Sequence, residues 1–221
     1  MKILLLGATG RTGRHVIEEA LKRGHEISAI ARDPEKLKDF SIDITQGTPY
    51  DYETVEKAIN GCDAVINTLN VSRKSDNPWS PLRSPKDLIS KSASNAIEAM
   101  EKQGTKRFVA MSTIGAGRSW KTSPGILKFF VSISNLKHAF RDHGRQEEML
   151  ENSAMDYTIC RAPMLSTKNN DTGAVATPEG EKPANTVLSR NSAAEFFLRI
   201  IENNEHIRET ISVSNKKRYA K

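Results

Sequence analysis

The chain has few of the residues on which several classes of protein depend. Its only two cysteines, Cys62 and Cys160, lie too far apart in sequence for a metal knuckle or a C-x-x-C redox pair. Cys160 falls in a run that predicts a buried strand, which favours a structural thiol in a reducing compartment. The longest apolar stretch, 126–136, is interrupted by Lys128 and Asn135 and is too short to span a bilayer. We therefore expect a cytoplasmic protein without a metal site or a membrane partner.

Composition indicates an ordinary soluble globular protein. Hydrophobic residues make up 37% and charged residues 27% of 221 residues, which excludes a disordered or fibrous chain. The net charge of +6 comes from Lys and Arg spread along the chain. This spread favours a solvated basic surface over a nucleic-acid partner.

Predicted strands alternate with predicted helices along most of the chain. The strands are expected at 2–6, 26–31, 42–45, 64–68, 107–111, 157–161 and 210–214. The helices are expected at 13–23, 52–60, from 84 to about 103, around 149–150 and at 193–201. Repeated β-α units of this length predict an α/β fold, a doubly wound and mostly parallel Rossmann-type sheet with helices on both faces. Because no Gly-, Pro- or Ser-rich linker divides the chain, we expect one domain over residues 1–221.

Three helix starts carry capping signals. Asp51 is the expected N-cap of the helix at 52–60. Ser84, followed by Pro85 at the first turn, is the expected N-cap of the next helix, with Asp87 at the positive end of its dipole. A capping box at 192–195 is expected to open the helix at 193–201.

A glycine-rich turn joins the first predicted strand to the first predicted helix. Its residues are Gly7, Ala8, Thr9, Gly10, Arg11, Thr12 and Gly13. Gly7 and Gly10 allow a tight turn and a close approach to a pyrophosphate, while Gly13 allows the helix to pack against the sheet. The helix N-terminus adds amide donors and partial positive charge. These residues predict a dinucleotide site.

The G-x-x-G-x-x-G spacing resembles that of the short-chain dehydrogenase/reductase superfamily. Within it, Gly-Ala-Thr-Gly near residue 1 is similar to the atypical members, the NmrA-like and biliverdin-reductase-B (flavin reductase)-like proteins. The similar segments are 30–33 with Leu37, 61–66, 108–113, 142–143 with 149–153, and 157–163. The resemblance covers nearly the whole chain and implies an NAD(P)-binding Rossmann domain, whose relatives include reductases, isomerase-like proteins and redox-sensing regulators.

The residues after the second strand indicate the cofactor. NAD requires a carboxylate there for its ribose hydroxyls, whereas the 2′-phosphate of NADP requires a cation. The strand ends in Ala31 and is followed by Arg32, and Arg11 in the glycine turn adds a second guanidinium. We therefore expect NADP(H) rather than NAD(H), with Asp33 as the counter-argument, since a register shift of one residue would place an acid at the ribose.

Further cofactor contacts are expected where other parallel strands end, because ligands of such sheets bind at the carboxyl ends of the strands. Thr48 and Pro49 are expected beside the adenine. Leu69, Asn70 and Val71 are expected near the nicotinamide ribose, and Pro163 is assigned to the same site.

Ser112, at the end of the fifth strand, is the first candidate catalytic residue. The resemblance implies that a serine here hydrogen-bonds the substrate carbonyl. No tyrosine lies between Ser112 and Tyr157, so the Tyr-x-x-x-Lys pair of the superfamily is absent. Met164 stands where flavin-reductase-like relatives carry a histidine. His143 is the second candidate, because its imidazole could orient the ribose or act as an acid at neutral pH.

Two classes of function remain open on the sequence. The first is an NADPH-dependent reductase of a flavin, quinone or other planar acceptor. The second is a catalytically weak NADP(H)-binding redox sensor of the NmrA-like type. Substrate-side loops are expected at 70–86 and 113–143, where four aromatic residues could stack on the acceptor, pack against the core or form a dimer contact: Trp79, Trp120, Phe129 and Phe130. We expect a small-molecule partner and a monomer or homodimer.

Overall fold

The computed structural model describes residues 1–170 and 172–217 and confirms the predicted α/β class. Its main sheet has eight strands in the order β3-β2-β1-β4-β5-β6-β10-β8. Neighbouring strands are parallel except at the edge, where β8 pairs antiparallel with β10. The chain order reverses between β1 and β4, the position at which open sheets of this kind bind ligands.

The strands of the main sheet are short and largely buried. They are β1 (Lys2–Leu6), β2 (Glu26–Ala31), β3 (Asp43–Gln46), β4 (Ala64–Asn67), β5 (Arg107–Thr113), β6 (Asp156–Ala162), β8 (Ala174–Pro178) and β10 (Glu209–Asn215). A separate parallel pair, which the sequence did not indicate, joins β7 (Met164–Ser166) to β9 (Val187–Ser189).

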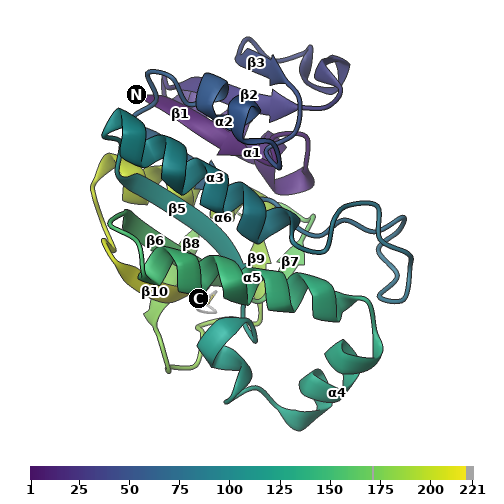
Figure 1. Cartoon of the computed structure of the whole chain (residues 1–221). Coiled ribbons are helices and arrows are strands. Elements are labelled where there is room, and N and C mark those ends of the chain that lie inside the picture. Colours follow the sequence, from purple (N-terminus) through teal and green to yellow (C-terminus); the bar gives the residue numbers. More distant parts are fainter. Residues whose placement is uncertain (171, 218–221) are drawn as a thin grey trace.

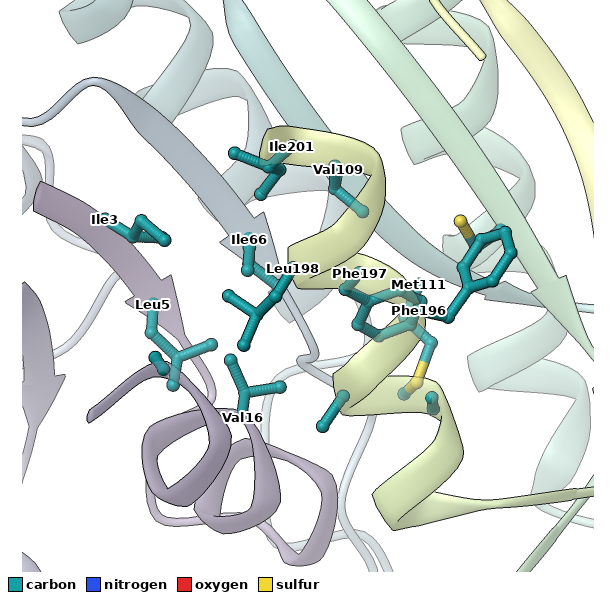
Figure 2. Close-up of a cluster of buried hydrophobic side chains, with 14 of the residues drawn as sticks. Ile3, Leu5, Val16, Ile66, Val109, Met111, Phe196, Phe197, Leu198 and Ile201 are labelled. Carbon is teal, nitrogen blue, oxygen red and sulfur yellow. The ribbon is translucent and has the colours of Figure 1, made fainter. Parts of the chain in front are cut away.

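Helices cover both faces of the sheet (Figure 1). The helical elements are α1 (Arg11–Lys22), η1 (Pro34–Leu37), α2 (Tyr52–Ala58), α3 (Leu88–Gln103), η2 (Gly117–Trp120), α4 (Gly125–Ile133), α5 (Leu136–Glu151) and α6 (Arg190–Glu202). Helices α1 and α6 pack together on one face, and α2, α3 and α5 on the other. Figure 2 shows the core under α1 and α6, where Leu5, Ile66 and Val109 of the sheet meet Val16 of α1 and Leu198 of α6.

Two predicted helix starts are wrong, and tertiary contacts explain both. α3 begins at Leu88, not after Ser84, because its first amides are capped from another helix: Asp142 Oδ2 of α5 accepts from the Ile89 amide at 2.7 Å. α6 begins at Arg190, three residues before the expected start, and Ser192 lies buried in its first turn. The predicted Asp51 cap is confirmed, with its side chain accepting from the Thr54 amide.

The segment between β5 and α5 contains η2 and α4. Trp79, in the loop between β4 and α3, meets Phe130 of α4 edge-on, with ring centroids 5.4 Å apart. Its indole N–H donates to the Ile133 carbonyl. Among the described residues, none of the helices has the length and apolar character needed to cross a membrane.

Candidate dinucleotide-binding site

The glycine turn leaves no room for side chains at its first and last positions. Gly7 has φ +90°, and a Cβ there would lie 2.8 Å from Thr68 Oγ1. Gly10 donates to the Gly7 carbonyl at 2.9 Å, and α1 begins at the next residue. A Cβ at Gly13 would lie 2.2 Å from the Gly7 carbonyl oxygen. The turn therefore brings bare backbone and the N-terminus of α1 to the carboxyl ends of β1 and β4, an arrangement that suits a pyrophosphate.

Two adjoining hollows lie over this turn. The central cavity, of about 340 Å³, is lined by Gly7, Thr9, Gly10, Arg11, Thr12, Arg32, Thr68, Leu69, Asn70, Val71, Ser72, Arg73, Ser75, Asp76, Leu88, Met111, Leu165 and Arg190. The lateral pocket, of about 100 Å³, shares some of these residues and adds Ile30, Ala31, Gly47, Thr48, Pro49, Ser84 and Pro85. The two hollows share Gly7, Thr9, Arg32, Leu69 and Leu88 and together form one groove over the turn.

The structure brings most of the predicted binding residues to this groove. Those that line it are Gly7, Thr9, Gly10, Arg11, Thr12, Arg32, Thr48, Pro49, Leu69, Asn70 and Val71. Ala8 is buried beneath the turn, and Gly13 acts through helix packing. Pro163, between β6 and β7, is not among the lining residues of either hollow, although Leu165 two residues later is.

A third hollow, the basic pocket, adjoins the central cavity through Thr9 and Arg32. It encloses about 270 Å³ and is completed by Asp33, Lys36 and Arg83. Asp33 lies 3.6 Å from the Lys36 ammonium. The pocket therefore contains three cationic side chains and one carboxylate, and the carboxylate already lies beside the Lys36 ammonium. This excess of positive charge favours binding of an anionic group such as a phosphate.

Arg11 forms an ion pair with the loop that follows β4. Its guanidinium forms a two-pronged ion pair with Asp76, at 2.7 Å and 3.0 Å. The same interaction holds the pKa of Asp76 below its usual value. Both side chains are exposed, so the pair contributes little to stability. It does, however, place the 72–83 loop against the glycine turn, at the rim of the central cavity.

Ser112 lies on the opposite face of β5 from the central cavity. Its hydroxyl is buried and donates to Glu147 of α5 at 2.6 Å. Glu147 also accepts from Arg161 of β6, at 3.0 Å from Nε and 2.8 Å from Nη2. Met111 lines the cavity instead, and because strand side chains alternate, Thr113 shares its face. A catalytic role for Ser112 stays a prediction.

His143 is buried on the face of α5 that packs toward the sheet. The residue is 3% exposed, and Nδ1 has no hydrogen-bond partner among the described residues. Burial lowers the pKa of the imidazole from 6.5 to about 4. The ring is therefore neutral at pH 7 in this structure, and its predicted role at the ribose remains untested.

His143 makes stability sensitive to acid. Because the unfolded chain binds the proton near pH 6.5 and the folded chain only near pH 4, stability falls as pH drops through this window and is full above it. At the lower end of this pH window the free energy of unfolding has fallen by about 3 kcal/mol. Urea unfolding at several pH values should show His143→Leu losing that much less than the wild type. If the free energies of unfolding of the two proteins changed with pH in parallel, the assignment to His143 would be contradicted. Asp142, whose pKa is raised by burial, is present in both proteins and therefore does not cause a difference between them.

Several cavity residues have no signal in the local sequence. Arg190 and Leu165 reach the central cavity because the β7–β9 pair places Leu165 opposite Leu188, two residues before Arg190. Arg83 comes from a loop with no periodicity. Met111 could have been predicted from the alternation of side chains along the fifth strand, and Lys36 from its position four residues after Arg32.

The loop aromatics lie away from the groove. Trp120 meets Phe140 of α5 edge-on, and both line an outer cavity of about 530 Å³ between η2, α4 and α5. Phe129 is exposed on α4 and Phe130 contacts Trp79. No described residue of the central cavity, lateral pocket or basic pocket is a Trp or Phe.

The fold and groove define a Rossmann-type nucleotide-binding domain. A family model described as NAD(P)H-binding matches residues 7–204, and the chain therefore belongs to the NAD(P)H-binding family. Photosystem II assembly factor Ycf39 of Synechocystis sp. is 25% identical over 225 residues, an alignment that covers 96% of this chain. The same alignment covers 62% of Ycf39, so this chain spans less than two thirds of that relative.

Solved structures share the fold across the whole chain. ChuY, an anaerobillin reductase from Escherichia coli O157:H7, superposes with a TM-score of 0.81 at 19% identity and full coverage of both chains. A short-chain dehydrogenase/reductase from Veillonella parvula in complex with NADP has a TM-score of 0.76 at 17% identity, with 99% of each chain covered. At these identities the two structures establish the fold alone.

Proposed function

We propose that the chain is an NADP(H)-binding oxidoreductase that reduces a flavin, quinone or similar planar acceptor. The observation that carries the cofactor choice is the basic pocket, where Arg32, Lys36 and Arg83 surround one hollow beside the adenosine end of the groove. A ribose 2′-phosphate would balance the excess positive charge of this pocket, where three cations face the single carboxylate of Asp33. The NADP bound to the Veillonella parvula neighbour and the reductase activity named for ChuY are consistent with this choice.

The residues that line the groove indicate which end would hold the adenine and which the nicotinamide. The glycine turn and α1 would hold the diphosphate, and Thr48 and Pro49 would lie beside the adenine. Val71, Met111 and Leu165 form an apolar wall at the other end, where a nicotinamide would lie. NADPH supplies a hydride when bound, and the protein's part is to hold donor and acceptor face to face and to exclude water.

A redox sensor is the second candidate function. It is favoured by the burial of Ser112 against Glu147 and by the neutral, enclosed imidazole of His143, because neither of these two candidate residues is then placed to donate a proton in the cavity. We further propose a small-molecule partner, a monomer or homodimer, and a cytoplasmic location, the last supported by two free buried thiols, Cys62 and Cys160.

NADPH consumption with FMN and a panel of small quinones separates the two candidates. Turnover above the free-flavin background supports the reductase, and tight NADPH binding without turnover of any acceptor supports the sensor. Ser112→Ala and Thr113→Val form a matched pair on the two faces of β5. A loss of kcat in the first variant supports Ser112, whereas a loss confined to the second moves the role to the cavity face.

The basic pocket predicts a measurable cofactor preference. Arg32→Gln and Lys36→Gln are each expected to weaken NADPH binding by about 10- to 150-fold, the equivalent of about 1.5–3 kcal/mol for a lost phosphate contact. NADH binding should change little, because NADH has no 2′-phosphate. Lys38→Gln is the control, since Lys38 is an exposed cation outside the pocket. Equal affinity of the wild type for NADPH and NADH would overturn the assignment.

A further inference from the structure

Arg190 is a buried cation in the wall of the central cavity and forms no ion pair with the other described residues. It is 8% exposed, and its Nη1 is enclosed with no hydrogen-bond partner among the described residues. The other buried arginines have more partners: Arg107 donates to four oxygen acceptors through Nη1 and Nη2, although its Nε has none among the described residues, and Arg161 is paired with two glutamates. A buried charge without a partner lowers the stability of the folded protein unless a bound ligand supplies the opposite charge.

The surroundings of Arg190 make the positive charge still less favourable. It is the first residue of α6, a 13-residue helix with no acidic residue in its first turn, so it lies at the positive end of the helix dipole. Burial and the nearby Arg11 both lower its pKa. Asp76 opposes this shift, but its carboxylate is already held by both prongs of Arg11.

The position of Arg190 is imposed by the fold. The preceding residue, Ser189, ends β9, and its amide and hydroxyl both donate to Asn215 Oδ1 of β10. Arg190 lines the central cavity with Met111 and Leu165 and is absent from the lining of the lateral and basic pockets. It therefore belongs to the central cavity and not to the lateral or basic pocket.

We propose that Arg190 binds an anionic group of a ligand held in the central cavity. This inference rests on the proposed function in taking that cavity as the dinucleotide site. The shared chemistry is a phosphate or carboxylate, and it has two sources: the diphosphate of the dinucleotide or an acidic group on the acceptor. In either case one bound anion compensates the buried guanidinium and the positive helix end together.

The test compares Arg190→Gln and Arg190→Lys with Arg199→Gln, a control cation on the same helix that pairs with Glu205 outside the cavity. Binding of NADPH is measured by titration, and FMN and riboflavin are titrated onto the NADP⁺-bound protein. These two flavins share the isoalloxazine ring and differ in the phosphate. Both sources predict that Arg190→Gln weakens one ligand at least 10-fold, that Arg190→Lys retains more affinity, and that Arg199→Gln resembles the wild type.

The pattern of losses identifies the source. Weaker NADPH binding with an unchanged FMN-to-riboflavin ratio assigns Arg190 to the diphosphate. Unchanged NADPH binding with weaker FMN but unaltered riboflavin assigns it to the acceptor. Unchanged binding of both NADPH and FMN overturns the proposal.

Two further measurements separate this proposal from the proposed function and from a merely structural role. Inorganic pyrophosphate should raise the Tm of the wild type and of Arg199→Gln but not that of Arg190→Gln, and equal shifts in all three would overturn the inference even if the wild type bound no NADPH. Without ligand, Arg190→Gln should melt no lower than the wild type, because it removes an uncompensated charge. A lower Tm would indicate a structural role and would also count against the proposal.

Discussion

Replacing Gly13 by alanine is expected to weaken NADPH binding by about 100-fold, the equivalent of about 2.7 kcal/mol. The added Cβ would lie 2.2 Å from the Gly7 carbonyl oxygen and 2.8 Å from the Ala8 Cα. Both neighbours are backbone atoms of the turn, so they cannot rotate away as a side chain would. The N-terminus of α1 must move off the turn instead, and the amide donors lose their positions for the diphosphate. Titration with NADPH, monitored by calorimetry, measures the change.

Two glycine variants control for the substitution itself. A Cβ at Gly125, at the start of α4, meets no heavy atom within 4 Å, so Gly125→Ala should bind NADPH as the wild type does. Gly10→Ala is intermediate, because its Cβ would lie 3.1 Å from the Gly7 carbonyl oxygen in a backbone conformation open to alanine. Its smaller loss of affinity reports on the turn even if Gly13→Ala proves too unstable to titrate. Gly13→Ala with an affinity within threefold of the wild type would refute the role of the turn.

Replacing Glu147 by glutamine is expected to lower the free energy of unfolding by about 3 kcal/mol, which for a chain of this size is a fall in Tm of about 6–12 °C. Glu147 and Arg161 are each only 2% exposed, and the carboxylate receives both the guanidinium and the Ser112 hydroxyl. The amide keeps the shape but leaves Arg161 with only Glu179, which is partly exposed, as its anion. A buried cation that loses its buried counterion carries the penalty of its own desolvation.

Calorimetry or urea unfolding measures this loss, with Glu148→Gln as the control on the exposed side of the same helix. The double variant Glu147→Leu with Arg161→Met should recover part of the stability, because it removes both charges from the interior. An effect of Glu147→Gln below about 1 kcal/mol would show that the pair is solvated. The same variant removes the negative charge from the acceptor of the Ser112 hydroxyl, so its activity also reports on whether that hydroxyl serves the reaction.

The adenosine side of the groove could be predicted from local pattern because it is built close to where strands end. Gly7, Arg32 and Thr48 each follow one of the first three strands, and parallel strands bring their carboxyl ends to one edge. The glycine spacing then identified the turn. Arg32 reaches the groove for the same reason, whereas Lys36 and Arg83, which complete its pocket, come from η1 and a loop.

The other end of the groove depends on contacts between distant segments. Arg190 reaches the cavity through the pairing of β7 with β9 and the hydrogen bonds to Asn215, none of which has a local signature. α3 begins where Asp142, 53 residues beyond Ile89, caps its amides, so the local signals at Ser84 and Pro85 were overridden. Likewise, nothing in the neighbourhood of Ser112 shows that its hydroxyl will donate to Glu147, which also pairs with Arg161.

The sequence by itself determined the alternating β-α order, the glycine turn and the cation after the second strand, since backbone freedom, periodicity and charge are properties of neighbouring residues. Only the tertiary structure decided which face of β5 meets the cavity, that His143 is enclosed and neutral, and that Arg190 Nη1, in the cavity wall, has no hydrogen-bond partner among the described residues. Those outcomes follow from burial and from partners far away in the chain, because the cost of a charge or a hydrogen-bonding group depends on what surrounds it after folding.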